Sequence, residues 1–322
     1  MGNTMFEQLK SSSVVAAAKV IAPHVKRTRL VRNDALSRMA GGDVFLKLEN
    51  EQITGSFKLR GALNALLTLP ERTKARGVVT SSAGNHGMGV AYAAKTVGVK
   101  AKIYVPRTAP EVKKSGIRSL GAELDDSQPD YDAAMAAARI FAKDSGREYI
   151  NPCLGDALLA GQGTVAFEIA EELPALKSLI VNVGGGGLLG GCASYIRNER
   201  ANVRMYGAQG VNTAAMAKSL EAKRVVAIPS VATLADGLAG QIDADALDIG
   251  THGLDDIVTL TEDEIARTIA WFAKELKMRV EGAGACAAGA ILHGKLRPET
   301  PCAVIVSGRN IDDARWQKIA RN

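Results

Sequence analysis

The fold is decided by the run Val183-Gly184-Gly185-Gly186-Gly187-Leu188-Leu189-Gly190-Gly191, which follows an apolar segment and opens a segment of helical period. Glycines carry no side chain, so several backbone N–H groups can converge on one anion at the positive end of a helix. The run is not a nucleotide-binding Gly-Lys-Ser/Thr loop, and it lacks the spacing of the dinucleotide fingerprint. It predicts a phosphate-binding turn between a strand and a helix. The alternative is a flexible turn that allows tight helix packing.

Outward from this run, short β-branched segments alternate with alanine-rich segments of helical period. The alternation predicts an α/β fold with mostly parallel sheets, in which ligands bind at the carboxyl ends of the strands. Because 322 residues are many for one core, we expect two lobes with a cleft between them. The predicted strands cover 44–49, 77–81, 102–105, 178–183, 204–209 and 303–307, and the predicted helices include 59–69, 88–97, 131–144 and 161–172.

Lys58 lies in the segment Thr54-Gly55-Ser56-Phe57-Lys58, just inside a predicted helix. The helix dipole repels a cation in the first turn, which favours the neutral amine needed to form an imine with a carbonyl group. Most lysines are solvated surface charges, so the position of Lys58 indicates a Schiff-base role only when it is taken together with the glycine run. An amine paired with a phosphate-binding turn indicates pyridoxal phosphate, which has an aldehyde and a phosphate.

Two further turns carry polar groups at predicted strand ends. The segment 81–87, Ser-Ser-Ala-Gly-Asn-His-Gly, could bind a carboxylate through its N–H groups and hydroxyls, and Asn85 could donate a hydrogen bond to a ring oxygen of a cofactor. His86 is a weaker candidate for acid–base chemistry, because a histidine at a helix start is often structural. Ser307, after the last strand, could contact a ring nitrogen or cap the next turn.

Composition excludes several classes of protein. The chain has 40 basic and 34 acidic residues, a net charge of +6, and only 4% aromatic residues. The few aromatic residues disfavour a nucleic-acid partner, and a small anionic ligand is enough to explain the modest positive charge. We find no apolar run long enough to cross a membrane and no signal peptide at the start. The four cysteines lack any Cys-x-x-Cys spacing. We therefore expect a soluble cytoplasmic protein with reduced thiols.

Taken in order, the motifs resemble those of fold type II pyridoxal-phosphate enzymes, and in particular the threonine/serine dehydratase and serine racemase family. The resemblance implies a tryptophan-synthase-β-like fold of two α/β domains, with a large domain from 1–76 and 156–322 and a small domain from 77–155. It covers about residues 20 to 315. The matching segments are LENEQITGSFKLRGA, SSAGNHGMGVA, PRTAP, AGQGT, VGGGGLLGG, LADGL, TEDEI, EGAGA and VSGRNID.

The resemblance assigns roles to individual residues. Lys58 would hold the cofactor as a Schiff base, with Phe57 beside the ring, Asn85 on the ring oxygen and Ser307 facing the pyridine nitrogen. A neutral hydroxyl at that nitrogen favours β-elimination over transamination. The phosphate would bind to Gly184, Gly185, Gly186, Gly187 and Leu188. The substrate carboxylate would bind to Ser82, Ala83, Gly84, Asn85 and His86.

The activity that the resemblance implies is conversion of L-threonine or L-serine to a 2-oxo acid and ammonia. Lys58 would remove the Cα proton. Racemases of this group use a serine as a second base, where this chain has Ala83, which cannot move a proton. Alternatives are dehydration of 3-hydroxyaspartate, phenylserine or a hydroxyectoine-derived compound, or serine racemisation. A homodimer is expected from the resemblance alone.

The chain departs from the family pattern at several positions. Gln209 and Ala215 stand where some relatives have metal-binding acids, so no metal is predicted. Arg309 replaces a glycine beside the cofactor and could pair with a second substrate carboxylate or face solvent. The chain ends at Asn322, without the regulatory domain of allosteric relatives, so inhibition by isoleucine is not expected.

Overall fold

The larger of two β-sheets forms the centre of the molecule, which is described here by a computed structural model of residues 4–321. Within those residues it has six strands in the order β1-β2-β10-β7-β8-β9, all parallel to their neighbours except β1, which pairs antiparallel with β2. The strands are β1 (Leu30–Arg32), β2 (Val44–Lys47), β10 (Cys302–Ile305), β7 (Ser178–Asn182), β8 (Arg204–Gly210) and β9 (Asp256–Leu260).

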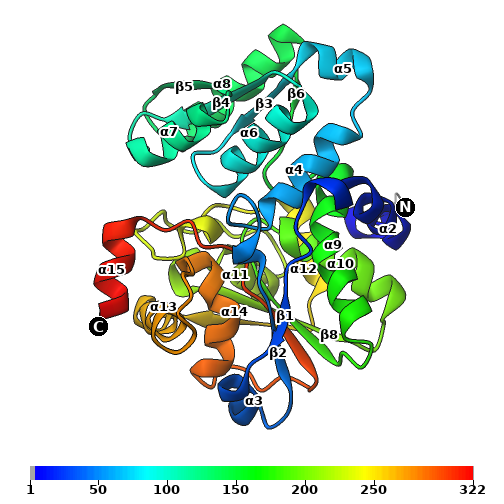
Figure 1. Cartoon of the computed structure of the whole chain (residues 1–322), viewed down its shortest axis with the longest axis vertical. Coiled ribbons are helices and arrows are strands. Elements are labelled where there is room, and N and C mark those ends of the chain that lie inside the picture. The colour runs from blue at the N-terminus through cyan, green and yellow to red at the C-terminus, as the bar shows by residue number, and fades with distance from the viewer. Residues whose placement is uncertain (1–3, 322) are drawn as a thin grey trace.

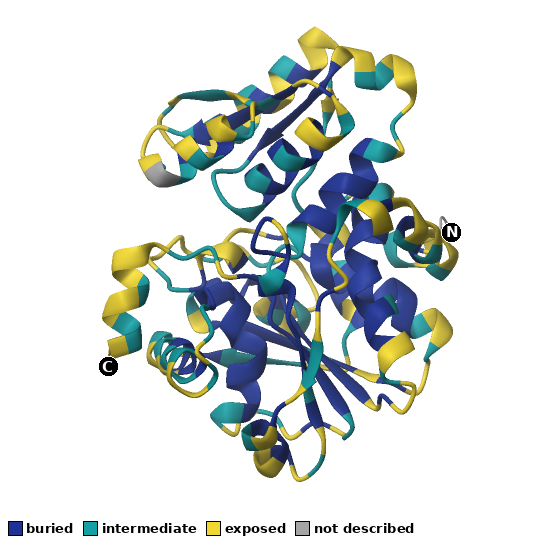
Figure 2. Ribbon diagram, viewed as in Figure 1, coloured by how far each residue is buried: buried dark blue, intermediate teal, exposed yellow. Residues whose placement is uncertain are grey.

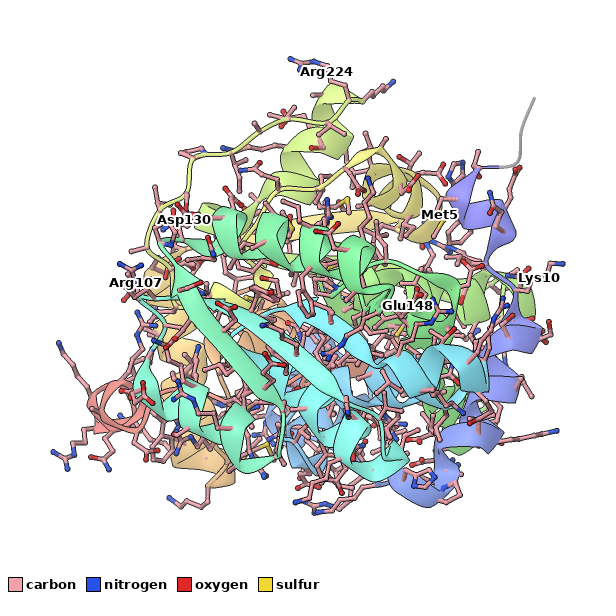
Figure 3. The ribbon with its side chains drawn as sticks, turned by 90° about the horizontal axis from the view of Figure 1, so that it is seen from above. Met5, Lys10, Arg107, Asp130, Glu148 and Arg224 are labelled. Carbon is pink, nitrogen blue, oxygen red and sulfur yellow. The ribbon has the colours of Figure 1, made fainter. Side chains whose placement is uncertain are left out.

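The smaller sheet has four parallel strands within the described residues, in the order β5-β4-β3-β6. They are β5 (Glu123–Gln128), β4 (Ala101–Pro106), β3 (Val78–Ser81) and β6 (Glu148–Tyr149). Figure 1 shows this sheet and its helices as a separate layer above the larger sheet. In Figure 3, Arg107 and Asp130, which follow β4 and β5, lie at one end of the sheet, and Glu148, which opens β6, lies toward the other.

Helices cover both faces of the six-stranded sheet (Figure 1). One apolar core joins the sheet to α2, α9, α10 and α12, and a second joins it to α3, α13 and α14. Figure 2 shows that buried residues run through the sheet and the helices beside it. The helix bounds are α1 (Met5–Gln8), α2 (Ser11–Ile21), α3 (Asp34–Ala40), α9 (Asp156–Glu172), α10 (Gly187–Glu199), α11 (Ala215–Ala222), α12 (Ala244–Gly253), α13 (Glu262–Leu276), α14 (Gly282–Leu292) and α15 (Asp313–Arg321).

The four-stranded sheet packs against α6, α7 and α8, and α4 links it to the larger sheet through contacts with both α6 and α9. The helices in this part of the chain are α4 (Lys58–Leu67), α5 (Glu71–Arg76), α6 (Asn85–Val97), α7 (Glu111–Ser119) and α8 (Tyr131–Ser145). Short 3-10 turns complete the described chain at η1 (Ala22–His24), η2 (Glu49–Glu51), η3 (Val211–Thr213) and η4 (Asp236–Leu238).

The predicted α/β fold with mostly parallel sheets is confirmed. The six predicted strands coincide with β2, β3, β4, β7, β8 and β10, and the four predicted helices with α4, α6, α8 and α9. Several boundaries were wrong, and the largest difference is five residues, because the helix predicted from residue 161 begins at Asp156. The strand predicted over 44–49 ends at Lys47, because the chain turns at Leu48 (φ −89°, ψ 63°) into η2. The helix predicted from residue 88 begins at Asn85, so Asn85 and His86 lie in its first turn.

A network of buried ion pairs fixes α4 between the two sheets. The Arg60 guanidinium, fully buried, donates two hydrogen bonds of 2.8 Å to Glu49 and bonds of 2.7 and 2.9 Å to Glu168 on α9. Lys47, also fully buried, lies 2.7 Å from the Glu168 carboxylate. Burial opposes ionisation of Glu168, but the charges and hydrogen bonds of Arg60 and Lys47 together outweigh burial and lower the pKa of this carboxyl.

Among the described residues, we find no helix with the length and apolar character needed to cross a membrane. Cys153, Cys192, Cys286 and Cys302 are free thiols. Residues 1–3 and 322, which belong to the predicted large domain, lie outside the described residues.

Candidate active site

Lys58 is the first residue of α4, as its position in the sequence predicts. Its Nζ atom donates a 2.6 Å hydrogen bond to the carbonyl oxygen of Pro152, in the segment that joins β6 to α9. The same atom lies 5.3 Å from the centre of the Phe57 ring. The amine is half-buried and bound to a neutral acceptor, so it can turn to a ligand without breaking an ion pair.

The glycine run connects β7 to α10, and its backbone forms the start of that helix. Gly186 has φ +91°, which favours glycine, and a Cβ on Gly185 would lie 2.6 Å from the Cys153 sulfur. Within residues 4–321 no side chain caps α10, so its first N–H groups are available to an anion. The geometry fits the predicted phosphate-binding turn.

The segment 82–86 runs from the end of β3 into the first turn of α6, and it forms a second helix start at which we find no side-chain cap among the described residues. The Gly84 N–H donates to the Ser82 hydroxyl at 3.3 Å, and no atom lies within 4 Å of where a Gly84 Cβ would be. A Cβ on Gly87 would lie 2.0 Å from the Ser82 carbonyl oxygen, so a glycine is required there. The open space beside Gly84 leaves room for a small anion.

His86 is buried and uncharged at neutral pH. Burial lowers its pKa to about 3, with the nearby Lys58 charge acting in the same direction. Its Nε2 lies 3.3 Å from the Ile150 carbonyl oxygen, and its Nδ1 has no hydrogen-bond partner among residues 4–321. A neutral imidazole has no readily donated proton, so His86 stays a weaker candidate for acid–base chemistry than Lys58.

Ser307 follows β10, is 3% exposed, and places its hydroxyl 3.5 Å from the Ala283 carbonyl oxygen. This contact is at the limit of a hydrogen bond, so the hydroxyl is available to a ligand.

The side chain of Asn85 is fixed from two sides. Its Nδ2 donates to Glu281 at 2.7 Å, and its Oδ1 accepts from the Asn310 amide at 2.6 Å. Sequence reasoning assigned no role to Glu281 or Asn310. Two signals for Glu281 were present in the sequence: it is an acidic residue directly before the apolar helix α14, and it begins the matching segment EGAGA.

All of the predicted site residues line one cavity of about 1300 Å³ between the two sheets. Arg309 lines the same cavity, is exposed, and its guanidinium makes no hydrogen bond or ion pair within the described part of the chain. The cavity therefore brings together an amine, two turns with free N–H groups, a carboxamide and a hydroxyl. The predicted site residues on its wall are Phe57, Lys58, Ser82, Ala83, Gly84, Asn85, His86, Gly184, Gly185, Gly186, Gly187, Leu188 and Ser307.

Gln209, which stands where some relatives have a metal-binding acid, makes hydrogen bonds to its own chain. The Gln209 amide donates to the Thr213 carbonyl oxygen and accepts from the Ala217 N–H, both at 3.0 Å. Across residues 4–321, no three His, Cys, Asp or Glu side chains are arranged to hold a metal ion.

Comparison with known families identifies the class of protein that this fold and cavity define. Residues 21–308 match the family described as pyridoxal-phosphate dependent enzyme, so the chain belongs to that family and its cofactor is pyridoxal phosphate. The residues present fit the cofactor, because Lys58 offers an amine to an aldehyde and the uncapped start of α10 offers N–H groups to a phosphate.

Within this family, the chain is similar to several proteins of named activity. The chain is 38% identical to the L-threonine ammonia-lyase of Thermotoga maritima, over 92% of this chain and 74% of the relative. It is 34% identical to a catabolic L-threonine dehydratase of Staphylococcus aureus, over 92% of this chain and 87% of the relative. Among solved structures, maize serine racemase gives a TM-score of 0.91 at 30% identity, covering 97% of each chain. A threonine deaminase of Solanum lycopersicum gives 0.89 at 29% identity, covering 99% of this chain and 89% of that one.

Proposed function

We propose that this enzyme is an ammonia-lyase that converts a β-hydroxy amino acid, L-threonine or L-serine, to a 2-oxo acid and ammonia. One observation carries the proposal: the Lys58 amine, the glycine run and the segment 82–86 face the same cavity. The relatives named for threonine dehydration, at 34–38% identity, support this substrate class.

The cofactor would be held by groups that the cavity already presents. Lys58 would bind it covalently beside Phe57, Asn85 and Ser307 would face the ring, and the N–H groups of Gly184 to Leu188 would bind the phosphate. When bound, pyridoxal phosphate withdraws electrons from an attached amino acid and so makes its Cα proton removable.

The residues around the cavity have separate roles in the proposed reaction. The N–H groups of segment 82–86 bind the substrate carboxylate, and the amine of Lys58 accepts the Cα proton. The Cα–H and Cβ–O bonds break and a Cα–Cβ double bond forms, and the hydroxyl leaves as water with a proton that balances the one removed from Cα. One water molecule is then consumed as the carbon–nitrogen bond is hydrolysed to give the 2-oxo acid and ammonia. The uncharged His86 contributes no proton to these steps.

Measurement of 2-oxo acid release from a series of β-hydroxy amino acids tests the substrate. We expect L-threonine or L-serine to give the highest kcat/KM, because the segment 82–86 offers one anion site and a single substrate carboxylate fills it. Release from 3-hydroxyaspartate alone would contradict this substrate and would implicate the unpaired Arg309 as the partner of a second carboxylate.

Ala83→Ser tests the preference for elimination over racemisation. The wild type is expected to form no D-isomer, because a methyl group cannot move a proton, whereas a serine hydroxyl at this place in the cavity wall can. Chiral chromatography of L-serine incubations should detect D-serine with the variant only. Ala83→Gly is the matched control and should form none; D-serine from the wild type would contradict the proposal.

We also propose the finer organisation of the molecule. The strands at 78–149 form the four-stranded sheet, which supports a small domain of 77–155 and a large domain of 1–76 and 156–322. The free thiols support a reducing compartment such as the cytoplasm. A homodimer is proposed from the resemblance to the dehydratase family, and sedimentation velocity would test it.

A further inference from the structure

The Glu281 carboxyl group lies in the wall of the cavity, and the proposed chemistry does not use it. Glu281 precedes α14, is 4% exposed, and accepts hydrogen bonds from the Asn85 side chain, at 2.7 Å, and from the Asn310 backbone. A Cβ on Gly308 would lie 2.3 Å from its Oε1 atom, so the chain at Gly308 leaves space for the carboxyl. The group is therefore held closely and has little solvent around it.

Glu281 and Asn310 together determine which way the Asn85 carboxamide points. Asn310 donates from its Nδ2 both to Asn85 Oδ1 at 2.6 Å and to the Thr54 carbonyl oxygen at 2.8 Å. Reversing the Asn85 amide would bring its oxygen against the Glu281 carboxylate and its NH2 group against that of Asn310. In the observed orientation, one N–H of Asn85 binds Glu281 and the second is left for a ligand.

The surroundings of Glu281 place its ionisation in the neutral range. Burial, together with the negative charge of Asp236 on η4, raises its pKa to about 7, while Lys113 on α7 and the hydrogen bonds from Asn85 and Asn310 act in the opposite direction. Lys113 also lies 3.3 Å from Asp236, so each of these charges is partly compensated by the other. Above that pH the carboxylate accepts the Asn85 hydrogen bond at full strength, and below it the bond weakens.

We propose that Glu281 is a positioning residue whose carboxylate aligns the Asn85 amide for the cofactor, and that its protonation releases this alignment. The proposal rests on the proposed contact between Asn85 and pyridoxal phosphate. It also assigns a role to the hydrogen bond between Asn85, which opens α6, and Glu281, which directly precedes α14.

Cofactor titration of the full-length enzyme, dialysed free of cofactor, tests the proposal. The apparent Kd for pyridoxal phosphate is measured from the visible absorbance between pH 5.5 and 8.5. We expect Glu281→Ala to weaken binding at pH 8 roughly tenfold, the loss expected for a hydrogen bond to a charged group. Glu281→Gln keeps an acceptor oxygen at every pH, so its affinity should stay within about threefold of the wild type at pH 8. It should also lack the weakening that the wild type shows as the pH falls through 7.

Glu264→Gln provides the matched control. Glu264 is also largely buried, but it caps α13 and pairs with Lys295 outside the cavity, so this variant should follow the wild-type titration. Wild-type affinity in Glu281→Ala, or a wild-type pH dependence in Glu281→Gln, would overturn the positioning role. Absence of any visible absorbance in the wild type would overturn the proposed function itself, so the two failures are distinguishable.

Discussion

Lys58→Ala is expected to abolish 2-oxo acid formation, with a loss in kcat/KM of at least about 10³-fold. The variant removes the one group that both carries the cofactor and accepts the Cα proton, and loss of a positioned base alone costs up to about 10⁴-fold. Alanine also removes the hydrogen bond to Pro152, which lines the same cavity. The visible absorbance of the bound cofactor should disappear together with the activity.

Lys74→Ala serves as the control for Lys58→Ala. Lys74 lies on α5, pairs with the exposed Glu71 and does not line the cavity, so its variant should keep activity and absorbance. Circular dichroism should show the same fold for both variants. Activity in Lys58→Ala within tenfold of the wild type would refute the assignment of Lys58.

Arg60→Met is expected to lower the free energy of unfolding by about 3–5 kcal/mol, the cost of removing one partner from a buried charge network. The variant leaves Glu49 without its cation and Glu168 with Lys47 alone. Urea unfolding followed by circular dichroism would measure the loss. A difference below about 1 kcal/mol, the value typical of surface pairs, would contradict the expected role of the network.

The sign of the pH dependence provides a second test of the Arg60 network. The pKa of Glu168 is lowered in the folded state, so its contribution to stability is present above the unfolded value of 4.5 and is lost as the pH falls below it. The gap between wild type and Arg60→Met should therefore be widest at neutral pH and narrow toward pH 4. Arg27→Met is the control, because Arg27 pairs with Glu171 and Glu172 with half of its side chain exposed and should change stability by less than about 1 kcal/mol.

Local patterns were enough to predict the parallel core and the turns that face the cavity. β7 is buried along its whole length, so its apolar run is distinctive, and the glycines after it are explained by their position between strand and helix. Lys58 was recognised because a cation at a helix start is unfavourable unless it has a use. In each case the signal lies within a few residues of the feature that it predicts.

Features that depend on distant partners could not be predicted from local patterns. β5 has the sequence Glu-Leu-Asp-Asp-Ser-Gln and is an exposed edge strand, so it lacks an apolar run, and β6 has only two residues. Arg60 and Glu168 are 108 residues apart in the sequence, and Asn85 and Glu281 are 196 apart. Only the three-dimensional fold shows that such residues meet.

The contacts around Asn85 have a consequence for the order in which the molecule can be made. Asn310 bonds to Asn85, 225 residues earlier, and to Thr54, 256 residues earlier. All strands of the four-stranded sheet are synthesised long before Asn310, yet the Asn85 amide lacks the second of its two partners, Glu281 and Asn310, until residue 310 has been made. A chain that ends before residue 310 therefore lacks the bonds that join Asn310 to Asn85 and Thr54, so its site is incomplete even though every strand of both sheets is present.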